Sequence, residues 1–380
     1  MITESGLNDY LFDTINAGAS DLHITVGLPP MIRVHGKVQP LEYPPLTVNM
    51  TREMIYDILS NDQRQRFETE WELDFAYTLP RTARFRVNVY LQKGSMGAAF
   101  RTIPYEIKSF QDLGLPKAIE QMADKPRGLV LVTGPTGSGK STTLASMIDK
   151  INQERQEHIM SVEDPIEFLH QHKQCIVNQR EVNQDTKSFA QALKHVLRQD
   201  PDVILVGEMR DLETIGLAIS AAETGHLVFG TLHTQDAPQT VDRIIDVFPS
   251  HQQSQIRAQL SIALQGIVTQ TLLPKRDGKG RVVACEILVP TPGVRNLIRE
   301  GKNHQIYSAM QTGGKFGMQT MDAALVELVR KGAISREEAE RRSSNPEELQ
   351  RLMGGAGAAT MSGDGAAARS GKSGYAAFRR

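Results

Sequence analysis

The chain has 380 residues, of which 40% are hydrophobic and 23% are charged, as in a globular protein with a sizeable core. Its formal net charge of −1 provides no global field for a polyanion and counts against a nucleic-acid partner. No apolar stretch approaches the roughly 18 residues of a membrane-spanning helix, and the first residues lack a secretory-signal pattern. We therefore expect a soluble, cytoplasmic protein of two or three domains with no direct membrane span.

The N-terminal region, residues 1–102, contains strand-like alternation and short helical stretches but no nucleotide motif, which predicts a separate α+β domain. Within residues 84–91 the polar and apolar side chains alternate strictly, so a strand there would place them on opposite faces. The polar face holds Arg84, Arg86, Asn88 and Tyr90, and the apolar face holds Phe85, Val87, Val89 and Leu91. Chain breaks at Pro104 and Gly114 then predict an interdomain linker over residues 103–116.

Residues 134–141 read Gly-Pro-Thr-Gly-Ser-Gly-Lys-Ser, a complete G-x-x-x-x-G-K-[ST] phosphate-binding loop. A short apolar run at 128–133 precedes it and a helical pattern over 142–152 follows, which is the context that aims a helix N-terminus at an anion. This pattern predicts that Lys140 reaches the β- and γ-phosphates of ATP and that Ser141 ligates Mg²⁺. The predicted nucleotide-binding residues are Gly134, Pro135, Thr136, Gly137, Ser138, Gly139, Lys140, Ser141 and Thr142.

A second domain is expected over residues 117–353. Its apolar strands alternate with helical patterns, as in a doubly wound α/β core, and lie at 129–132, 158–162, 203–206 and 227–232. Three further stretches are predicted to be amphipathic helices that form a helical appendage, at 260–273, 294–299 and 320–331. Residues 354–380 are rich in Gly, Ala and Ser and are predicted to be a disordered tail.

Hydrolysis needs a group that orients a water molecule opposite the γ-phosphate, and Glu208 is the best candidate. It follows the 203–206 strand, whose carboxyl end should lie near the phosphate loop. The alternative is a solvated acidic residue in a turn. Gly207 stands where a magnesium-orienting Asp is usual, so metal ligation rests mainly on Ser141.

Other polar residues follow neighbouring strands. Glu163, after the 158–162 strand, could orient water or metal. Asp164 is equally compatible with a structural turn, and for Glu167 the structural interpretation is favoured. His226 and His233 flank the 227–232 strand, and their odd separation points them to opposite faces. A structural histidine is the alternative at both, but His233 at the carboxyl end is placed to sense a γ-phosphate.

The arginines of the N-terminal region have two interpretations. Arg84, Arg86 and the later Arg101 could form a solvated strand face. Alternatively, they reach the phosphates of a neighbouring subunit, because an arginine supplied in trans accelerates phosphoryl transfer by about 10³- to 10⁵-fold. The two cysteines, Cys175 and Cys285, are too few for a disulfide framework and too far apart in sequence for a Cys-x-x-Cys zinc pair, and we expect two buried thiols.

Together these segments resemble the secretion and type IV pilus ATPases, and within that family the pilus retraction branch. The resemblance covers roughly residues 5–345. It is carried by Ala-Ser-Asp-Leu-His-Ile at 19–24, the arginine strand, the phosphate loop, the acidic box at 162–167, Val-Gly-Glu-Met-Arg-Asp at 206–211 and the histidine box at 225–234. The most specific segment, residues 294–302, is similar to the retraction signature Ala-Ile-Arg-Asn-Leu-Ile-Arg-Glu, with Val294 for Ile and Gly293 for Ala.

The resemblance implies an N-terminal PAS-like domain, a RecA-like ATPase domain and a homo-hexameric ring with ATP at subunit junctions. It implies a cytoplasmic motor, peripheral at the inner membrane, that grips a platform protein of the pilus machine and powers pilus retraction, possibly beside a paralogous retraction ATPase. It also implies the roles given above for the site residues, Lys140, Ser141, Glu163, Glu208, His233, Arg84, Arg86 and Arg101.

Four other functions are compatible with parts of the sequence. The extension ATPase of the same system carries a zinc-binding cysteine cluster that this chain lacks. An accessory retraction ATPase has a longer C-terminus, as here, but the retraction signature is nearly intact. A RecA-type nucleic-acid motor is disfavoured by the near-neutral charge, and a nucleotide-gated scaffold without turnover is the last alternative.

Overall fold

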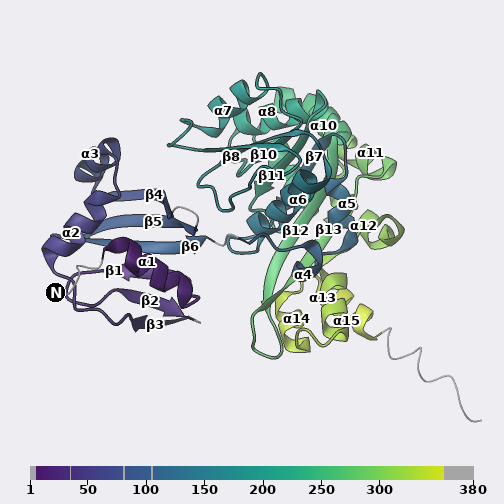
Figure 1. Ribbon diagram of the computed structural model, residues 1–380. Coiled ribbons are helices and arrows are strands. Elements are labelled where there is room, and N and C mark those ends of the chain that lie inside the picture. Colours follow the sequence, from purple (N-terminus) through teal and green to yellow (C-terminus); the bar gives the residue numbers. More distant parts are fainter. Residues whose placement is uncertain (1–5, 35, 80–81, 104–105, 355–380) are drawn as a thin grey trace, which may run out of the picture.

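The computed structural model describes residues 6–34, 36–79, 82–103 and 106–354, which build two separate sheets one after the other along the chain (Figure 1). The predicted tail at 355–380 lies outside these residues, as do 104 and 105 within the predicted linker. Within the described part of the chain, every helix is too short or too polar to cross a membrane.

The first sheet has six strands in the order β3-β2-β1-β6-β5-β4, and all its neighbours are antiparallel. Its strands are β1 Asp21–Ile24, β2 Met31–Val34, β3 Lys37–Pro40, β4 Glu72–Leu79, β5 Ala83–Gln92 and β6 Ser95–Ile103. Three helices accompany it, α1 Leu7–Asn16, α2 Val48–Asp57 and α3 Asn61–Glu70. Their apolar side chains share one core with the sheet.

Strand β5 confirms the predicted alternation along most of its length. Phe85, Val87 and Val89 are fully buried, while Arg86 on the opposite face is exposed. The prediction is wrong at Leu91, which is exposed and lies one residue before the end of β5, next to the β5–β6 hairpin turn at Lys93 and Gly94.

The second sheet has seven strands in the order β13-β12-β7-β11-β10-β8-β9, parallel except for the pair β12–β13. The strands are β7 Gly128–Thr133, β8 His158–Glu163, β9 Ile176–Glu181, β10 Val203–Val206, β11 Leu227–Leu232, β12 Leu264–Pro274 and β13 Arg281–Leu288. All four predicted strands are present, which confirms the α/β prediction.

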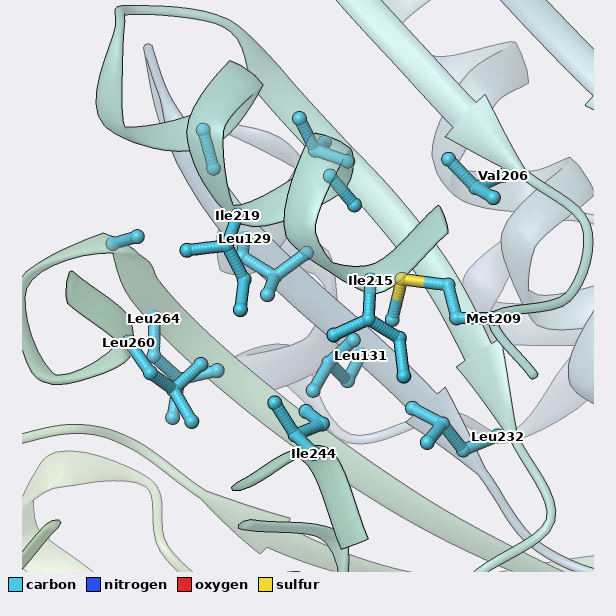
Figure 2. Packing of buried hydrophobic residues seen from close by; sticks show 14 of the residues in the cluster. Leu129, Leu131, Val206, Met209, Ile215, Ile219, Leu232, Ile244, Leu260 and Leu264 are labelled. Carbon is cyan, nitrogen blue, oxygen red and sulfur yellow. The ribbon is translucent and has the colours of Figure 1, made fainter. Parts of the chain in front are cut away.

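Helices cover both faces of this sheet, because alternate strand residues point to opposite sides. Leu129 and Leu131 of β7 pack with Ile215 and Ile219 of α8 on one face (Figure 2), and Val130 packs in a second cluster on the other face. The helices of this part are α4 Phe110–Leu113, α5 Lys117–Ala123, α6 Lys140–Glu154, α7 Phe189–Val196, α8 Leu212–Glu223, α9 Ala237–Asp246, α10 Ser250–Ala263 and α11 Pro292–Glu300.

A C-terminal group of helices packs at one end of the long β12–β13 hairpin (Figure 1). It contains α13 Met321–Arg330, α14 Arg336–Arg342 and α15 Pro346–Gly354, and α12 Ile306–Thr312 precedes it. The predicted helices at 294–299 and 320–331 are confirmed as α11 and α13.

The predicted helix at 260–273 is wrong. Helix α10 ends at Ala263, and residues 264–274 form β12, which pairs with both β7 and β13. A central strand is apolar on both faces, so its periodicity does not distinguish it from a buried helix. The β-branched residues Ile267, Val268 and Thr269 were the available signal for a strand.

Candidate active site

Polar side chains from four strand ends meet at one edge of the second sheet. The phosphate loop follows β7, His233 follows β11, Glu208 follows β10 and Glu163 ends β8. These strands are parallel and adjacent in the order β7-β11-β10-β8, so their carboxyl ends share one edge. They border a cavity of about 360 Å³. Its lining includes Thr136, Gly137, Gly139, Lys140, Ser141, Thr142, Glu163, Asp164, Pro165, Glu167, Gly207, Glu208, Thr231 and His233.

The loop from Gly134 to Gly139 has a backbone that only glycine supports at its bends. Gly134 has φ +130°, and a Cβ there would lie 2.3 Å from the Gln270 carbonyl oxygen of β12. Gly139, with φ +92°, precedes the first residue of α6 and has no side chain to cap that helix. The first N–H groups of α6 are therefore left to bind an anion beside the cavity.

Lys140 is the cation of this loop. Its ammonium donates hydrogen bonds to the carbonyl oxygens of Gly134, at 2.8 Å, and Pro135, at 3.1 Å. Burial lowers the pKa of Lys140, while the charges of Glu208 and Glu167 act in the opposite direction. A phosphate in the cavity would replace these carbonyl contacts with charge-assisted hydrogen bonds, which are roughly twice as strong as neutral ones.

Glu208 is held between two basic side chains. Arg210 forms a two-pronged ion pair with its carboxylate, with Nη2 at 2.7 Å from Oε2, and His233 Nε2 lies 3.0 Å from Oε1. Burial by itself raises the pKa of Glu208, but the hydrogen bonds and charges of Arg210 and His233 outweigh it and the net pKa is lowered. Glu208 is thus an ionised carboxylate that can accept hydrogen bonds from a water molecule in the cavity.

Close packing of two strand ends explains why position 207 holds a glycine where an Asp is usual. A Cβ at this position would lie 3.1 Å from the Cα of Glu163 and 3.2 Å from the carbonyl oxygen of Val162. The Gly207 carbonyl also accepts a hydrogen bond from the Thr231 hydroxyl at 2.5 Å. The absence of a side chain at Gly207 therefore leaves room for the backbone of Val162 and Glu163 at the end of β8.

Glu163 is partly buried and its carboxylate accepts two hydrogen bonds on one oxygen. They come from the Ser161 hydroxyl, at 2.6 Å, and the Gln179 amide, at 3.1 Å. Burial raises the pKa of Glu163 to about 7, although these two hydrogen bonds lower it. A carboxyl with this pKa changes protonation near neutral pH, which suits a group that exchanges protons with a bound nucleotide or water.

The two histidines of the histidine box lie at opposite ends of β11. His233 lies in the cavity beside Glu208, whereas His226 lies at the opposite end of β11 and its Nδ1 is 2.9 Å from the Ala221 carbonyl oxygen. Of the two alternatives for these histidines, the structural role therefore fits His226. Asp164 and Glu167 both line the cavity, and their role as turn or site residues stays open.

The three arginines of the N-terminal sheet have different surroundings. Arg84 is largely buried, and its Nη2 lies 2.5 Å from Glu181 Oε2 at the end of β9. Arg101 pairs with Asp21 at 3.0 Å yet keeps 70% of its side chain exposed. Arg86 is exposed and lines, with Arg101, a smaller cavity that also contains Thr142 and Glu167. In a single chain, Arg86 and Arg101 thus face the phosphate-loop region. Arg84 is instead largely buried in its ion pair with Glu181.

Three cavity residues were missed in the sequence, namely Phe189, Leu272 and Arg281. Leu272 belongs to β12, which was predicted as a helix, and Arg281 begins β13, for which no strand was predicted. Arg281 is an exposed cation beside the phosphate loop, and the sequence contains no motif around it. The two cysteines are buried free thiols, as expected.

Comparisons with known proteins match this architecture along most of the chain. A family model described as type II/IV secretion system protein matches residues 2–341. The type IV pilus retraction ATPase PilT of Pseudomonas aeruginosa is 54% identical over 343 residues, covering 90% of this chain and 99% of that protein. A twitching motility protein of Neisseria gonorrhoeae is 53% identical, covering 84% of this chain and 86% of that protein.

A paralogue and a crystal structure extend the comparison. The type IV pilus ATPase PilU of Pseudomonas aeruginosa is 43% identical, covering 89% of this chain and 88% of that protein. The crystal structure of the pilus retraction motor PilT with bound ADP superimposes with a TM-score of 0.86 at 50% identity, covering 92% of this chain and all of that one. The chain therefore has the two-sheet α/β fold of that ATPase and belongs to the type II/IV secretion system protein family.

Proposed function

We propose that this chain is an ATPase motor that powers type IV pilus retraction, and with it twitching motility. The observation that carries the proposal is the single cavity in which the phosphate loop faces the Glu208–His233 pair. One side of this cavity fits a triphosphate and the other presents an ionised carboxylate that can orient water. The similarity to the retraction ATPase PilT, which exceeds that to PilU, supports retraction over the accessory alternative.

Each site residue has a proposed role in hydrolysis. Backbone N–H groups of residues 134–139 and the Lys140 ammonium hold the β- and γ-phosphates of ATP. Glu208 orients the attacking water, and His233, bonded to the same carboxylate, responds to the presence of the γ-phosphate. Glu163 is placed to take up or release a proton at the edge of the cavity.

The cavity also suits a magnesium ion. Ser141 contributes a hydroxyl oxygen, and the carboxylates of Glu163 and Glu208 lie in the same cavity, which matches the preference of Mg²⁺ for oxygen ligands. We propose that Ser141 binds the ion directly. When bound, Mg²⁺ neutralises charge on the phosphates, and the protein residues hold and orient the nucleotide around it.

We further propose that six copies form a ring with nucleotide at the subunit junctions. Arg86 and Arg101 are proposed to stabilise the charge developing on the transferred phosphoryl group, supplied to the neighbouring site. Arg84 belongs to the same set, and its pairing with Glu181 within the chain would have to open for it to reach a phosphate. Movement of the N-terminal sheet against the ATPase part would then transmit force.

The proposed partner is an inner-membrane platform protein of the pilus machine, gripped from the cytoplasmic side, possibly together with a paralogous retraction ATPase. The 292–300 helix, α11, carries the retraction-like signature, and its Arg295 donates hydrogen bonds to the carbonyl oxygens of Ser261 and Ile262 at the end of α10. That anchorage fixes the exposed side of α11 relative to the ATPase sheet.

The proposal is tested by measuring ATP hydrolysis of the purified chain and pilus retraction in cells that depend on it. Wild type should hydrolyse ATP and restore retraction, whereas Lys140→Ala should lose both. A chain truncated after Met353 should keep hydrolysis and reveals whether the tail contributes to retraction. Hydrolysis that requires DNA or RNA, with a steep salt dependence, would replace the proposal with a nucleic-acid motor.

A further inference from the structure

A buried carboxylate lies between the histidine-box segment and the C-terminal helices. Glu286, in the middle of β13, has 1% of its surface exposed. Its Oε1 accepts a hydrogen bond from the backbone N–H of Ala237 at 2.7 Å. The backbone N–H of Met321 is a second donor group that faces the carboxylate and acts to lower its pKa. A buried carboxylate persists only where such donors compensate for lost hydration.

The two donors occupy equivalent positions in two different helices. Ala237 is the first residue of α9, and Met321 is the first residue of α13. First-turn N–H groups have no partner within their own helix. In both helices the capping side chain, Asp236 or Thr320, accepts a hydrogen bond from the third N–H. The first N–H is left for Glu286, which accepts a hydrogen bond from that of Ala237 and faces that of Met321. When it is ionised, its charge lies at the positive end of two helix dipoles.

One of these helices begins directly after the catalytic edge. His233 contacts Glu208, and only residues 234–236 separate it from the start of α9. Within that segment the Thr234 hydroxyl lies 2.6 Å from the Thr240 hydroxyl of α9. The start of α9 is therefore joined to the side chain that contacts Glu208 by a very short, hydrogen-bonded connection.

The other helix leads into the C-terminal group. The segment before α13 pairs with β13 around Glu286, through reciprocal backbone hydrogen bonds between Ile287 and Gln319 of 2.8 and 3.0 Å. Helix α13 then packs against α15, with Leu325 and Leu349 in one buried cluster. One side chain thus joins the histidine-box segment to the helices at the far end of the hairpin.

We propose that Glu286 is a positioning residue for ATP hydrolysis, which holds the His233 segment in register and couples it to the C-terminal helices. Glu286 does not touch the nucleotide cavity and acts through α9. This inference rests on the proposed ATPase function, but the hydrogen bonds on which it is built can be tested in a chain with or without turnover. Burial raises the pKa of Glu286 to about 7, as expected for a carboxyl near Asp236 and Asp322.

The first test is a double-mutant cycle on turnover in the full-length chain. Glu286→Gln, which preserves shape, should lower kcat about tenfold and leave ATP affinity within about twofold of wild type. In a His233→Ala background the same substitution should lower kcat by less than about twofold, because its effect passes through His233. An equal fall in kcat in both backgrounds, wild-type kcat in the single variant, or loss of ATP binding would overturn the proposal.

A matched control is available in Glu348, a buried carboxylate of α15. It accepts hydrogen bonds from Tyr307, at 2.8 Å, and Gln311, at 2.5 Å, and so joins the C-terminal helices without contacting α9. Glu348→Gln should leave kcat unchanged. A fall in kcat equal to that of Glu286→Gln would show that general loosening of the C-terminal helices is the cause, and this would also overturn the proposal.

A second measurement requires no variant to fold. In wild type, hydrogen exchange at the Ala237 and Met321 amides should be as slow as in the interior of α9 and α13, although first-turn amides ordinarily exchange fast. Fast exchange at both amides would overturn the proposal even if the chain is an active ATPase. A wild-type chain with slow exchange at both amides but no hydrolysis would instead contradict the proposed function.

Discussion

The Arg84 guanidinium lies 2.5 Å from the Glu181 carboxylate, joining the N-terminal sheet to the end of β9 in the ATPase part. The exposed fractions are 16% for the Arg84 side chain and 4% for that of Glu181. The same Glu181 oxygen accepts a hydrogen bond from the Ile166 backbone N–H at 3.1 Å, inside the acidic box beside the nucleotide cavity. The N-terminal sheet is thereby connected to that cavity through two consecutive polar contacts.

Loss of Arg84 should destabilise the chain, because it leaves the Glu181 carboxylate buried and unpaired. Arg84→Ala is expected to lower the free energy of unfolding by about 3 kcal/mol. Urea unfolding of the nucleotide-free protein, followed by circular dichroism, measures the change. The double variant Arg84→Ala, Glu181→Ala should recover part of the loss, since no buried charge is left unpaired.

Arg101 provides the comparison for this prediction. It also pairs with a carboxylate, Asp21, but most of its side chain is in solvent. Exposed pairs contribute about 0–1 kcal/mol, so Arg101→Ala should change the free energy of unfolding by no more than that. Equal losses in Arg84→Ala and Arg101→Ala would contradict a special role for the Arg84–Glu181 pair.

Substitution of Glu208 should separate ATP binding from hydrolysis. Glu208→Gln keeps the shape of the side chain but removes the charge that orients water, so kcat should fall by at least about 100-fold. The affinity for ATP should stay within a few-fold of wild type, because the phosphate loop is intact. Single-turnover hydrolysis and equilibrium binding of a fluorescent ATP analogue measure the two quantities.

The control is an exposed glutamate close in sequence. Glu213, in the first turn of α8, pairs with Lys194 away from the cavity lining. Glu213→Gln should hydrolyse ATP at the wild-type rate. Wild-type turnover in Glu208→Gln would disprove the proposed role of Glu208, whatever the control shows.

The sequence predicted the parallel strands and the cavity of the second sheet better than it predicted the β12–β13 hairpin at the sheet's edge. The phosphate loop, Glu208, Glu163 and His233 were found because each follows a short apolar strand, and parallel strands bring their carboxyl ends together. Strand β12 was missed because a strand buried on both faces lacks period-two alternation. Arg281 was missed with it, since its position depends on the partner strand rather than on any local motif.

Contacts between the two sheets were beyond sequence reasoning for a different reason. Arg84 and Arg86 share one face of β5, and from the sequence both had the same two interpretations, a solvated face or contact with a neighbouring subunit's phosphates. Glu181 lies 97 residues after Arg84, and only the relative placement of the two sheets shows that it pairs with one arginine and not the other. Glu286 similarly joins two helix starts that no motif connects.

Glu163 should contribute a pH-dependent term to stability. Because burial raises its pKa to about 7 from 4.5, the carboxyl stabilises the fold fully below about pH 4.5 and loses this contribution as the pH rises through 7. The free energy of unfolding of wild type minus that of Glu163→Gln should therefore fall over this interval, by about 3 kcal/mol at most. Urea unfolding of the nucleotide-free proteins at several pH values measures it.

For Glu208 the same experiment should show a pH dependence of stability with the opposite sign. Its pKa is lowered by Arg210 and His233 despite burial, so its contribution to stability is present above about pH 4.5 and lost as the pH falls through its folded-state pKa. The difference between wild type and Glu208→Gln should fall on acidification. Parallel pH curves for wild type and Glu163→Gln would contradict the burial-raised pKa of Glu163.

Arg86 can act either on the nucleotide of its own chain or on that of a neighbouring subunit. In a single chain Arg86 lines a cavity with Thr142 and Glu167, so it faces the phosphate-loop region of its own chain, whereas the proposed ring would let it serve a neighbour. Arg86→Ala and Lys140→Ala should each lower kcat strongly when assembled alone, by about 10³-fold or more for an arginine acting on the phosphoryl group. Mixing the two variants distinguishes the alternatives.

If Arg86 acts in trans, a Lys140→Ala subunit donates its arginine to an adjacent Arg86→Ala subunit whose phosphate loop is intact, and mixed rings regain turnover. For random mixing at equal amounts, about one site in four has both an intact loop and a donated arginine, so about a quarter of the wild-type rate is expected. If Arg86 serves its own chain, every subunit in the mixture lacks one required group and no activity returns. Hydrolysis rates measured across several mixing ratios decide between the two alternatives. As the control, the Lys140→Ala, Arg86→Ala double variant replaces Lys140→Ala in the mixture, and no activity should return.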